Sequence, residues 1–132
     1  MSEDIGKLVL RVGTGVLILL HGIFKLQNGV DGVAGMLTAH GLPSVLAYGV
    51  YLGEVVAPVL VIIGLYTRIA AVVMAGNMVV AFALAHMAQL FSIGPMGGWA
   101  LELQGMYLFA SIAIALLGAG RLSVGGTAGR YN

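Results

Sequence analysis

The sequence contains no cysteine among its 132 residues. This absence excludes disulfides, thiolate metal sites, cysteine-held iron–sulfur clusters and persulfide chemistry within the chain. Charged side chains are scarce too, at 8% of residues, and the net charge is +1 with no basic run. The composition therefore predicts no nucleic-acid partner. A redox role would need a bound cofactor, a metal on histidine or carboxylate ligands, or a partner subunit.

Hydrophobic residues are abundant instead. They make up 60% of the chain, and the mean hydropathy is +1.04. A soluble domain of this size cannot bury so much apolar surface, and soluble domains typically have about a quarter of their residues charged. The lipid bilayer is therefore the expected surroundings of the chain.

Four apolar segments are long enough to cross a bilayer, which takes about 20 residues in a helix. They cover residues 5–26, 44–66, 69–90 and 99–118. The sequence thus predicts an all-α fold, an integral membrane four-helix bundle that forms a single domain over residues 1–132.

The first connection is long enough to hold a short helix of its own. Asp31 is a candidate N-cap for a helix that runs to His40, and Gly41 and Pro43 would stop it. The apolar residues of this stretch fall on one side, so we expect it to lie along the membrane surface.

Basic residues are distributed unequally between the two predicted sides. Four spans place both termini on one side, and Lys25 falls on the other. The terminal side carries Lys7, Arg11, Arg68, Arg121 and Arg130. The positive-inside rule then predicts that both termini are cytoplasmic and that the first loop is extracytoplasmic.

Small residues recur every four positions in the second span, at Gly49, Gly53 and Ala57. Such a pattern lets helices approach closely in lipid. Packing within the bundle is the favoured interpretation, and a homo-oligomer through this face is the alternative.

The first span carries ionisable residues in a regular pattern. Arg11, Thr14, Ile18, His21 and Lys25 follow a 3,4,3,4 spacing and so form one stripe on a helix. An isolated charge at the centre of a bilayer costs about 3 kcal/mol or more. The stripe is therefore expected to face the interior of the bundle.

Helix geometry places several other polar groups near this stripe. His21, Lys25, His86 and Glu102 fall at a similar depth near the extracytoplasmic side, with Glu54 below them. The predicted ligand-binding set is Arg11, His21, Lys25, Glu54, His86 and Glu102.

Two neutral polar residues are expected to lie outside this cluster. Asn77 is nine positions from His86 and so lies on the opposite face of its helix, where packing is its expected role. Gln104 is likewise turned away from Glu102.

Glu54 is followed four residues later by Pro58, which has no N–H to donate to the Glu54 carbonyl. One interpretation is structural, namely an ion pair with Arg11 or Lys25, or a protonated carboxyl, beside a packing kink. The other is a carboxylate that handles protons.

Histidines on two helices leave three interpretations open. His21 and His86 can ligate a haem or a metal, can hydrogen-bond and protonate a quinone, or can simply be satisfied polar groups. A quinone is favoured over haem or metal, so no metal site is predicted.

Six motifs follow one another along the chain, namely "RVGTGVLILLHGIFKL", "HGLP", "GE", "GLYTR", "LELQGMYL" and "GAGRLSVGG". This ordered set resembles the DoxX family of small bacterial membrane proteins. The matching residues are Arg11, His21, Gly22, Lys25, Gly41, Pro43, Glu54, Arg68, Glu102 and Arg121. The resemblance implies a four-helix bundle in the bacterial inner membrane, associated with oxidoreductase complexes that include quinol oxidase and thiosulfate:quinone oxidoreductase. Without cysteine or a soluble domain, independent thiosulfate oxidation is not expected of this chain.

Three hypotheses for function follow. The first is a membrane subunit of an oxidoreductase complex that binds a quinone, with His21 and Glu54 as catalytic proton-handling residues and a partner supplying electrons. Lys25 and Glu102 would set the local field, and His86 would close the site. The second is a carrier or channel-like protein for a small molecule or ion. The third is a structural anchor that recruits soluble redox enzymes to the membrane.

Overall fold

A computed structural model describes residues 2–83, 93, 97–98, 101–127, 129 and 131–132, and its elements in these ranges are all helical. The long first helix is α1 (Ser2–Asn28), followed by the short α2 (Asp31–Ala39). The later helices are α5 (Thr67–Ala81) and α6 (Glu102–Leu117). Between α2 and α5 lies a segmented rod made of η1 (Ser44–Tyr48), α3 (Gly49–Tyr51), η2 (Leu52–Val56) and α4 (Ala57–Ile63).

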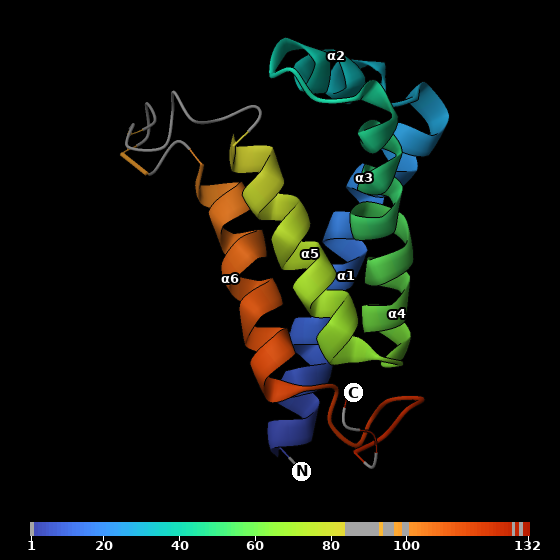
Figure 1. Ribbon diagram of the computed structural model, residues 1–132. Helices are drawn as coiled ribbons and strands as arrows, with labels where there is room; N and C mark the ends of the chain where they lie inside the picture. The colour runs from blue at the N-terminus through green and yellow to red at the C-terminus, as the bar shows by residue number, and fades with distance from the viewer. Residues whose placement is uncertain (1, 84–92, 94–96, 99–100, 128, 130) are drawn as a thin grey trace.

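Figure 1 shows α1, the segmented rod, α5 and α6 running alongside one another. Helix α1 contacts α4 and α6, and α5 contacts the same two helices from the other side. Helix α2 lies across one end of this arrangement, and both ends of the chain lie at the opposite end (Figure 1). The two ends are called the α2 end and the terminal end below.

The helical prediction for the first two spans is confirmed. Helix α1 and the rod Ser44–Ile63 are each long and apolar enough to cross a membrane, judged by length and composition. Helices α5 and α6 are shorter apolar helices, of 15 and 16 residues, in the described part of the chain. The remainder of the predicted third span, up to residue 90, lies mostly outside the described residues.

The short helix in the first connection is confirmed, but its predicted cap is not. Asp31 is the first helical residue of α2, while Val30 occupies the cap position and no side chain makes a capping hydrogen bond. Asp31 still carries a negative charge in the first turn, where it complements the helix dipole.

The segmented rod, which is the second of the four rods along the chain, changes its hydrogen-bonding pattern just before Pro58. The turns over Leu52–Val56 are π-helical, and the Ala57 N–H donates to the carbonyl of Leu52, five residues earlier. Pro58 then lies in the first turn of α4, where a missing N–H costs least. The predicted irregularity at Glu54 therefore takes the form of a π-helical segment with Glu54 at its centre.

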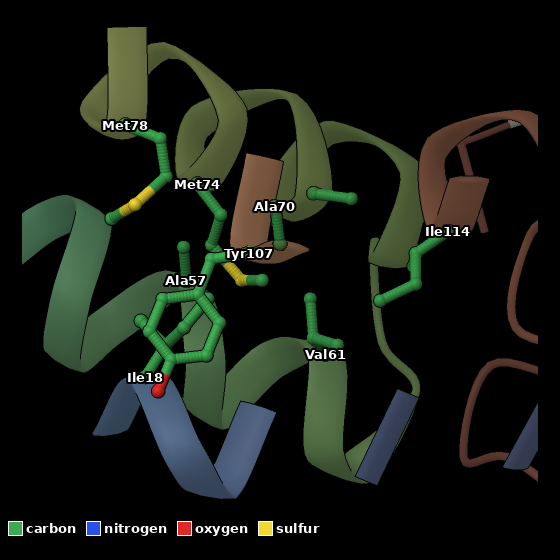
Figure 2. Close-up of a cluster of buried hydrophobic side chains, with 9 residues drawn as sticks. Ile18, Ala57, Val61, Ala70, Met74, Met78, Tyr107 and Ile114 are labelled. Atoms are coloured by element: carbon green, nitrogen blue, oxygen red, sulfur yellow. The ribbon is translucent and has the colours of Figure 1, made fainter. Parts of the chain in front are cut away.

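The core lies where the four rods meet. Figure 2 shows Ile18, Val61, Met74 and Tyr107 converging from α1, α4, α5 and α6. The outward faces of the same helices carry large exposed apolar side chains. Examples are Val9, Leu17, Phe24, Val72, Phe109 and Leu116. Such a surface suits lipid, because in water it would form large exposed hydrophobic patches.

The small residues of the second rod pack within the chain. A Cβ at Gly53 would overlap the side chain of Asn77 on α5, and Ala57 is buried in the core. Gly49 has no such neighbour, because nothing lies within 4 Å of the position of its missing Cβ. The favoured interpretation, close packing within the bundle, is therefore confirmed for Gly53 and Ala57, and the homo-oligomer stays a prediction.

Two arginines close helix ends at the terminal end. Arg11 is 1% exposed and donates hydrogen bonds to the carbonyls of Val61 at 3.0 Å, Ile62 at 2.8 Å and Leu122. Arg68 donates to the carbonyls of Ala115 and Leu116 at 3.1 and 2.8 Å. The last carbonyls of a helix have no partner within it, so these guanidinium groups satisfy the C-termini of α4 and α6.

Candidate functional site

A cavity of about 250 Å³ lies between the rods on the side toward α2. Residues from α1, α2, α3, η2, α5 and α6 contribute to its wall. The lining residues are Ile18, His21, Lys25, Val33, Met36, Val50, Glu54, Asn77, Met78, Val80, Ala81, Leu103, Gln104 and Tyr107. We call this space the head cavity. Its wall is largely apolar and carries a few polar groups, the usual composition of a ligand site.

An ion pair crosses the wall of the head cavity. The Lys25 Nζ atom lies 2.5 Å from Oε2 of Glu54, and the side chains are 29% and 6% exposed respectively. Of the two sequence interpretations of Glu54, the structure therefore contains the ion pair, with Lys25 as the partner. Of the two charged groups, the Lys25 ammonium is therefore the one nearer to water.

The backbone brings α1 close enough for this pair to form. A Cβ added at Gly22 would overlap the carbonyl of Glu54, so only glycine fits at this crossing. One turn further on, the Tyr51 hydroxyl donates to the Lys25 carbonyl at 3.1 Å. Pro58 cannot donate to the Glu54 carbonyl, and this carbonyl lies against Gly22 at the point where α1 crosses the rod.

His21 meets Tyr107 at the edge of the core. The Tyr107 hydroxyl and Nε2 of His21 are 3.4 Å apart, and the rings pack edge to face with centroids 5.7 Å apart. Tyr107 is held in the hydrophobic cluster (Figure 2), whereas His21 is exposed. The tyrosine therefore restrains the imidazole while leaving part of it accessible.

Asn77 and Gln104 both line the head cavity, so the prediction that they lie outside the site was wrong. Asn77 does pack against Gly53 as expected, but the same position places it beside Glu54 in the cavity wall. The error arose because the helix face of Asn77 was judged relative to His86, and that of Gln104 relative to Glu102. Each amide shares a helix face with another residue of the cavity wall, because Asn77 precedes Ala81 by four residues and Gln104 precedes Tyr107 by three.

Three other predicted site residues lie elsewhere. Arg11 belongs to the terminal end, where its guanidinium is bound by carbonyls. Glu102 is exposed at the start of α6, with its carboxylate against Gly98, and is not in the cavity wall. His86 lies outside the described residues. Of the six predicted ligand-binding residues, the structure thus brings together His21, Lys25 and Glu54.

No group of three or more His, Cys, Asp or Glu side chains able to hold a metal ion occurs within the described ranges. His86 is not part of those ranges, so the pairing of His21 with His86 as metal or haem ligands stays open.

The head cavity combines hydrogen-bond donors and acceptors at its wall. The Lys25 ammonium and the two amides can donate to a ligand oxygen, and Glu54 can accept or release a proton. His21 and Tyr107 can do either. The polar groups lie among Ile18, Met78 and other apolar side chains, which suits a ligand with both polar and apolar parts.

Comparison with known proteins assigns the family. The sequence matches DoxX over residues 6–87. The chain belongs to the DoxX family. Over 118 residues it is also 36% identical to a Bacillus subtilis (strain 168) protein named "Putative oxidoreductase CatD", covering 89% of this chain and 83% of that protein. No solved structure matches the chain. Family membership, together with the two long apolar helices, makes this DoxX chain a membrane protein.

The DoxX motifs divide between the two ends of the molecule. At the α2 end, His21, Gly22, Lys25 and Glu54 form or support the head cavity. At the terminal end, the segment Gly64–Arg68 makes the turn between α4 and α5, with Gly64 at φ +78° and Arg68 bound to the end of α6. The first group faces a cavity, whereas the second holds helix ends together.

Proposed function

We propose that this DoxX chain is a membrane subunit of an oxidoreductase complex and that its head cavity binds the ring of a quinone. A single observation carries the proposal: an ion pair, an imidazole, a phenol and two amides converge on a largely apolar cavity within the bundle. The name of the Bacillus subtilis relative supports an oxidoreductase context.

The roles of the residues follow from quinone chemistry. Reduction of a quinone to a quinol takes up two electrons and two protons. Lys25 and His21 donate hydrogen bonds to the carbonyl oxygens, which carry the developing negative charge, and Glu54 exchanges protons with these same oxygens, which become the hydroxyl groups of the quinol. The proposal assigns the supply of electrons to a redox group on a partner protein, and the cysteine-free chain cannot itself hold a cysteine-ligated iron–sulfur cluster.

The membrane arrangement in this proposal has four spans with both termini in the cytoplasm of a bacterial cell. The terminal end carries Arg11 and Arg68 among its basic residues, as the positive-inside rule requires. The α2 end is then extracytoplasmic, and α2 lies along the outer membrane surface. Lys25 is the more exposed member of the ion pair with Glu54, and in this arrangement it contacts water on the extracytoplasmic side.

The carrier and anchor hypotheses are less well supported. A carrier path along the stripe of α1 would have to pass Ile18, which is buried in the core, and Arg11, which three carbonyls hold in place. A purely structural anchor needs no cavity at all. Neither hypothesis uses the amides of Asn77 and Gln104.

Calorimetric titration of a tail-less quinone into protein in nanodiscs tests this function. Empty nanodiscs measure partitioning into lipid and are subtracted. We expect saturable binding by the wild type and binding weakened about tenfold by Glu54→Gln or Asn77→Leu, since each removes a polar contact worth about 1–1.5 kcal/mol. Glu3→Gln, an exposed carboxylate at the far end of α1, is the matched control. Absent binding, or equal binding by all four proteins, would rule out the site.

A further inference from the structure

A second cavity, of about 490 Å³, lies next to the head cavity. Its wall comes from α2, η1, α3, η2 and α5 and includes Leu37, Leu42, Leu46 and Val73. Among the lining residues in the described ranges, Asn77 alone has a polar side chain. We call this space the tail groove, because it is larger and less polar than its neighbour.

The two cavities share part of their walls. Val33 of α2, Val50 of α3, and Asn77 and Val80 of α5 line both of them. Asn77 therefore stands at the boundary, with the polar groups of the head cavity on one side and aliphatic side chains on the other. A ligand with a polar end joined directly to an apolar end can therefore contact both spaces, each with the matching part.

Glycines keep the tail groove open. Gly49 and Gly76 line it from α3 and α5, and nothing lies within 4 Å of the position of a Cβ at either residue. Both are on helices, where glycine costs about 1 kcal/mol relative to alanine, and neither has a positive φ. Their small size is therefore not explained by packing or backbone conformation, but it does leave room for an occupant.

We infer that the tail groove holds the isoprenoid chain of the quinone whose ring occupies the head cavity. This inference rests on the proposed function and adds the substrate class, a quinone with a polyprenyl tail. The branched, apolar chain matches the aliphatic wall, and the shared residues set where ring and chain join. The isoprenoid tail of an unbound quinone already lies in lipid, so moving it into the groove gains little from the hydrophobic effect. The contribution of the tail to the binding free energy comes from packing contacts and is modest.

The test compares two quinones in nanodiscs, one with a two-prenyl tail and one with a methyl group in its place. Affinities are corrected for partitioning with empty nanodiscs. The variants Gly76→Leu and Gly49→Leu introduce a larger side chain into the groove from α5 and from α3. Gly13→Leu is the matched control, because Gly13 is also helical with open space around it and lines neither cavity. Melting temperatures verify folding.

We expect the wild type and Gly13→Leu to prefer the tailed quinone by about threefold or more, a difference of packing contacts. Gly76→Leu and Gly49→Leu should lose that preference while binding the tail-less quinone as the wild type does. An unchanged preference in both groove variants would overturn the inference and leave the proposed function standing. Equal affinity of the wild type for both quinones, as expected if a bilayer acyl chain fills the groove, would also overturn it. Failure of the wild type to bind either quinone would overturn the proposed function itself.

Discussion

The Nζ atom of Lys25 lies 2.5 Å from Oε2 of Glu54, so that a charged pair joins the last turns of α1 to the π-helical segment of the second rod. The pair lies in the wall of a cavity rather than in solid packing. It therefore combines a structural contact between two rods with a charge that a ligand can reach.

A double-mutant cycle measures the coupling within this pair. Glu54→Gln and Lys25→Met each leave the other member without its charged partner, and we expect each to destabilise the fold by about 1–3 kcal/mol. The double variant should be more stable than the sum of the two losses predicts, because no uncompensated charge is left. Thermal unfolding in detergent micelles provides the measurement. Strictly additive losses would show that the two side chains are independent.

Glycine at position 22 is required by the crossing of α1 over Glu54. We expect Gly22→Ala to destabilise the protein by about 1–3 kcal/mol or more, because the new methyl group overlaps a backbone carbonyl that cannot rotate away. Gly13→Ala is the matched control on the same helix, in open space, and it should gain up to about 1 kcal/mol from helix propensity. Melting temperatures of the two variants should therefore move in opposite directions. A shift of the same sign would contradict the crossing geometry.

Arg11 should matter for stability and not for ligand binding. Its guanidinium makes hydrogen bonds to three carbonyls far from the head cavity, so Arg11→Met should cost about 3 kcal/mol or more. Arg121→Met, which removes an exposed charge at the same end, should cost within about 0.5 kcal/mol.

Quinone titration of the folded Arg11→Met protein separates the two roles. We expect its affinity to stay near the wild-type value, whereas Glu54→Gln should weaken binding. Loss of quinone binding by a stably folded Arg11→Met protein would instead show that Arg11 contributes to the ligand site, as the sequence analysis predicted from the stripe on α1.

The sequence predicted helical segments well because apolar runs of spanning length have few alternatives in lipid. It also placed His21, Lys25 and Glu54 together, since helical spacing and depth determine which side chains can meet. The contribution of Arg11 was misjudged because spacing gives a direction around α1 but not the nature of the partner. A sequence does not show which backbone carbonyls at helix ends are free to accept a hydrogen bond, and such carbonyls are the partners of the two terminal nitrogens of Arg11.

The amides of the cavity were missed for a related reason. Asn77 and Gln104 were oriented relative to charged residues, on the assumption that charges define the inner face. The head cavity instead lies where α5 and α6 present Asn77, Met78 and Tyr107, and Glu102 points away from it. Which face of a helix points inward depends on how neighbouring helices cross. The close crossing of α1 over the segmented rod at Gly22 exists only in the folded structure and cannot be read from either helix alone.

The proposed orientation in the membrane can be tested cleanly because the chain has no cysteine. Single cysteines at Thr38, an exposed residue of α2, and at the exposed Ser2 and Thr127 report on the two ends of the bundle. We expect a membrane-impermeant maleimide to label Thr38→Cys in intact cells, and Ser2→Cys and Thr127→Cys only after permeabilisation. The physical reason is the excess of arginine and lysine at the terminal end, which is retained in the cytoplasm during insertion. The cysteine-free wild type gives the background. Labelling of Ser2→Cys or Thr127→Cys from outside would invert the orientation and move the head cavity to the cytoplasmic side, where the protons for quinone reduction would then be drawn from the cell interior.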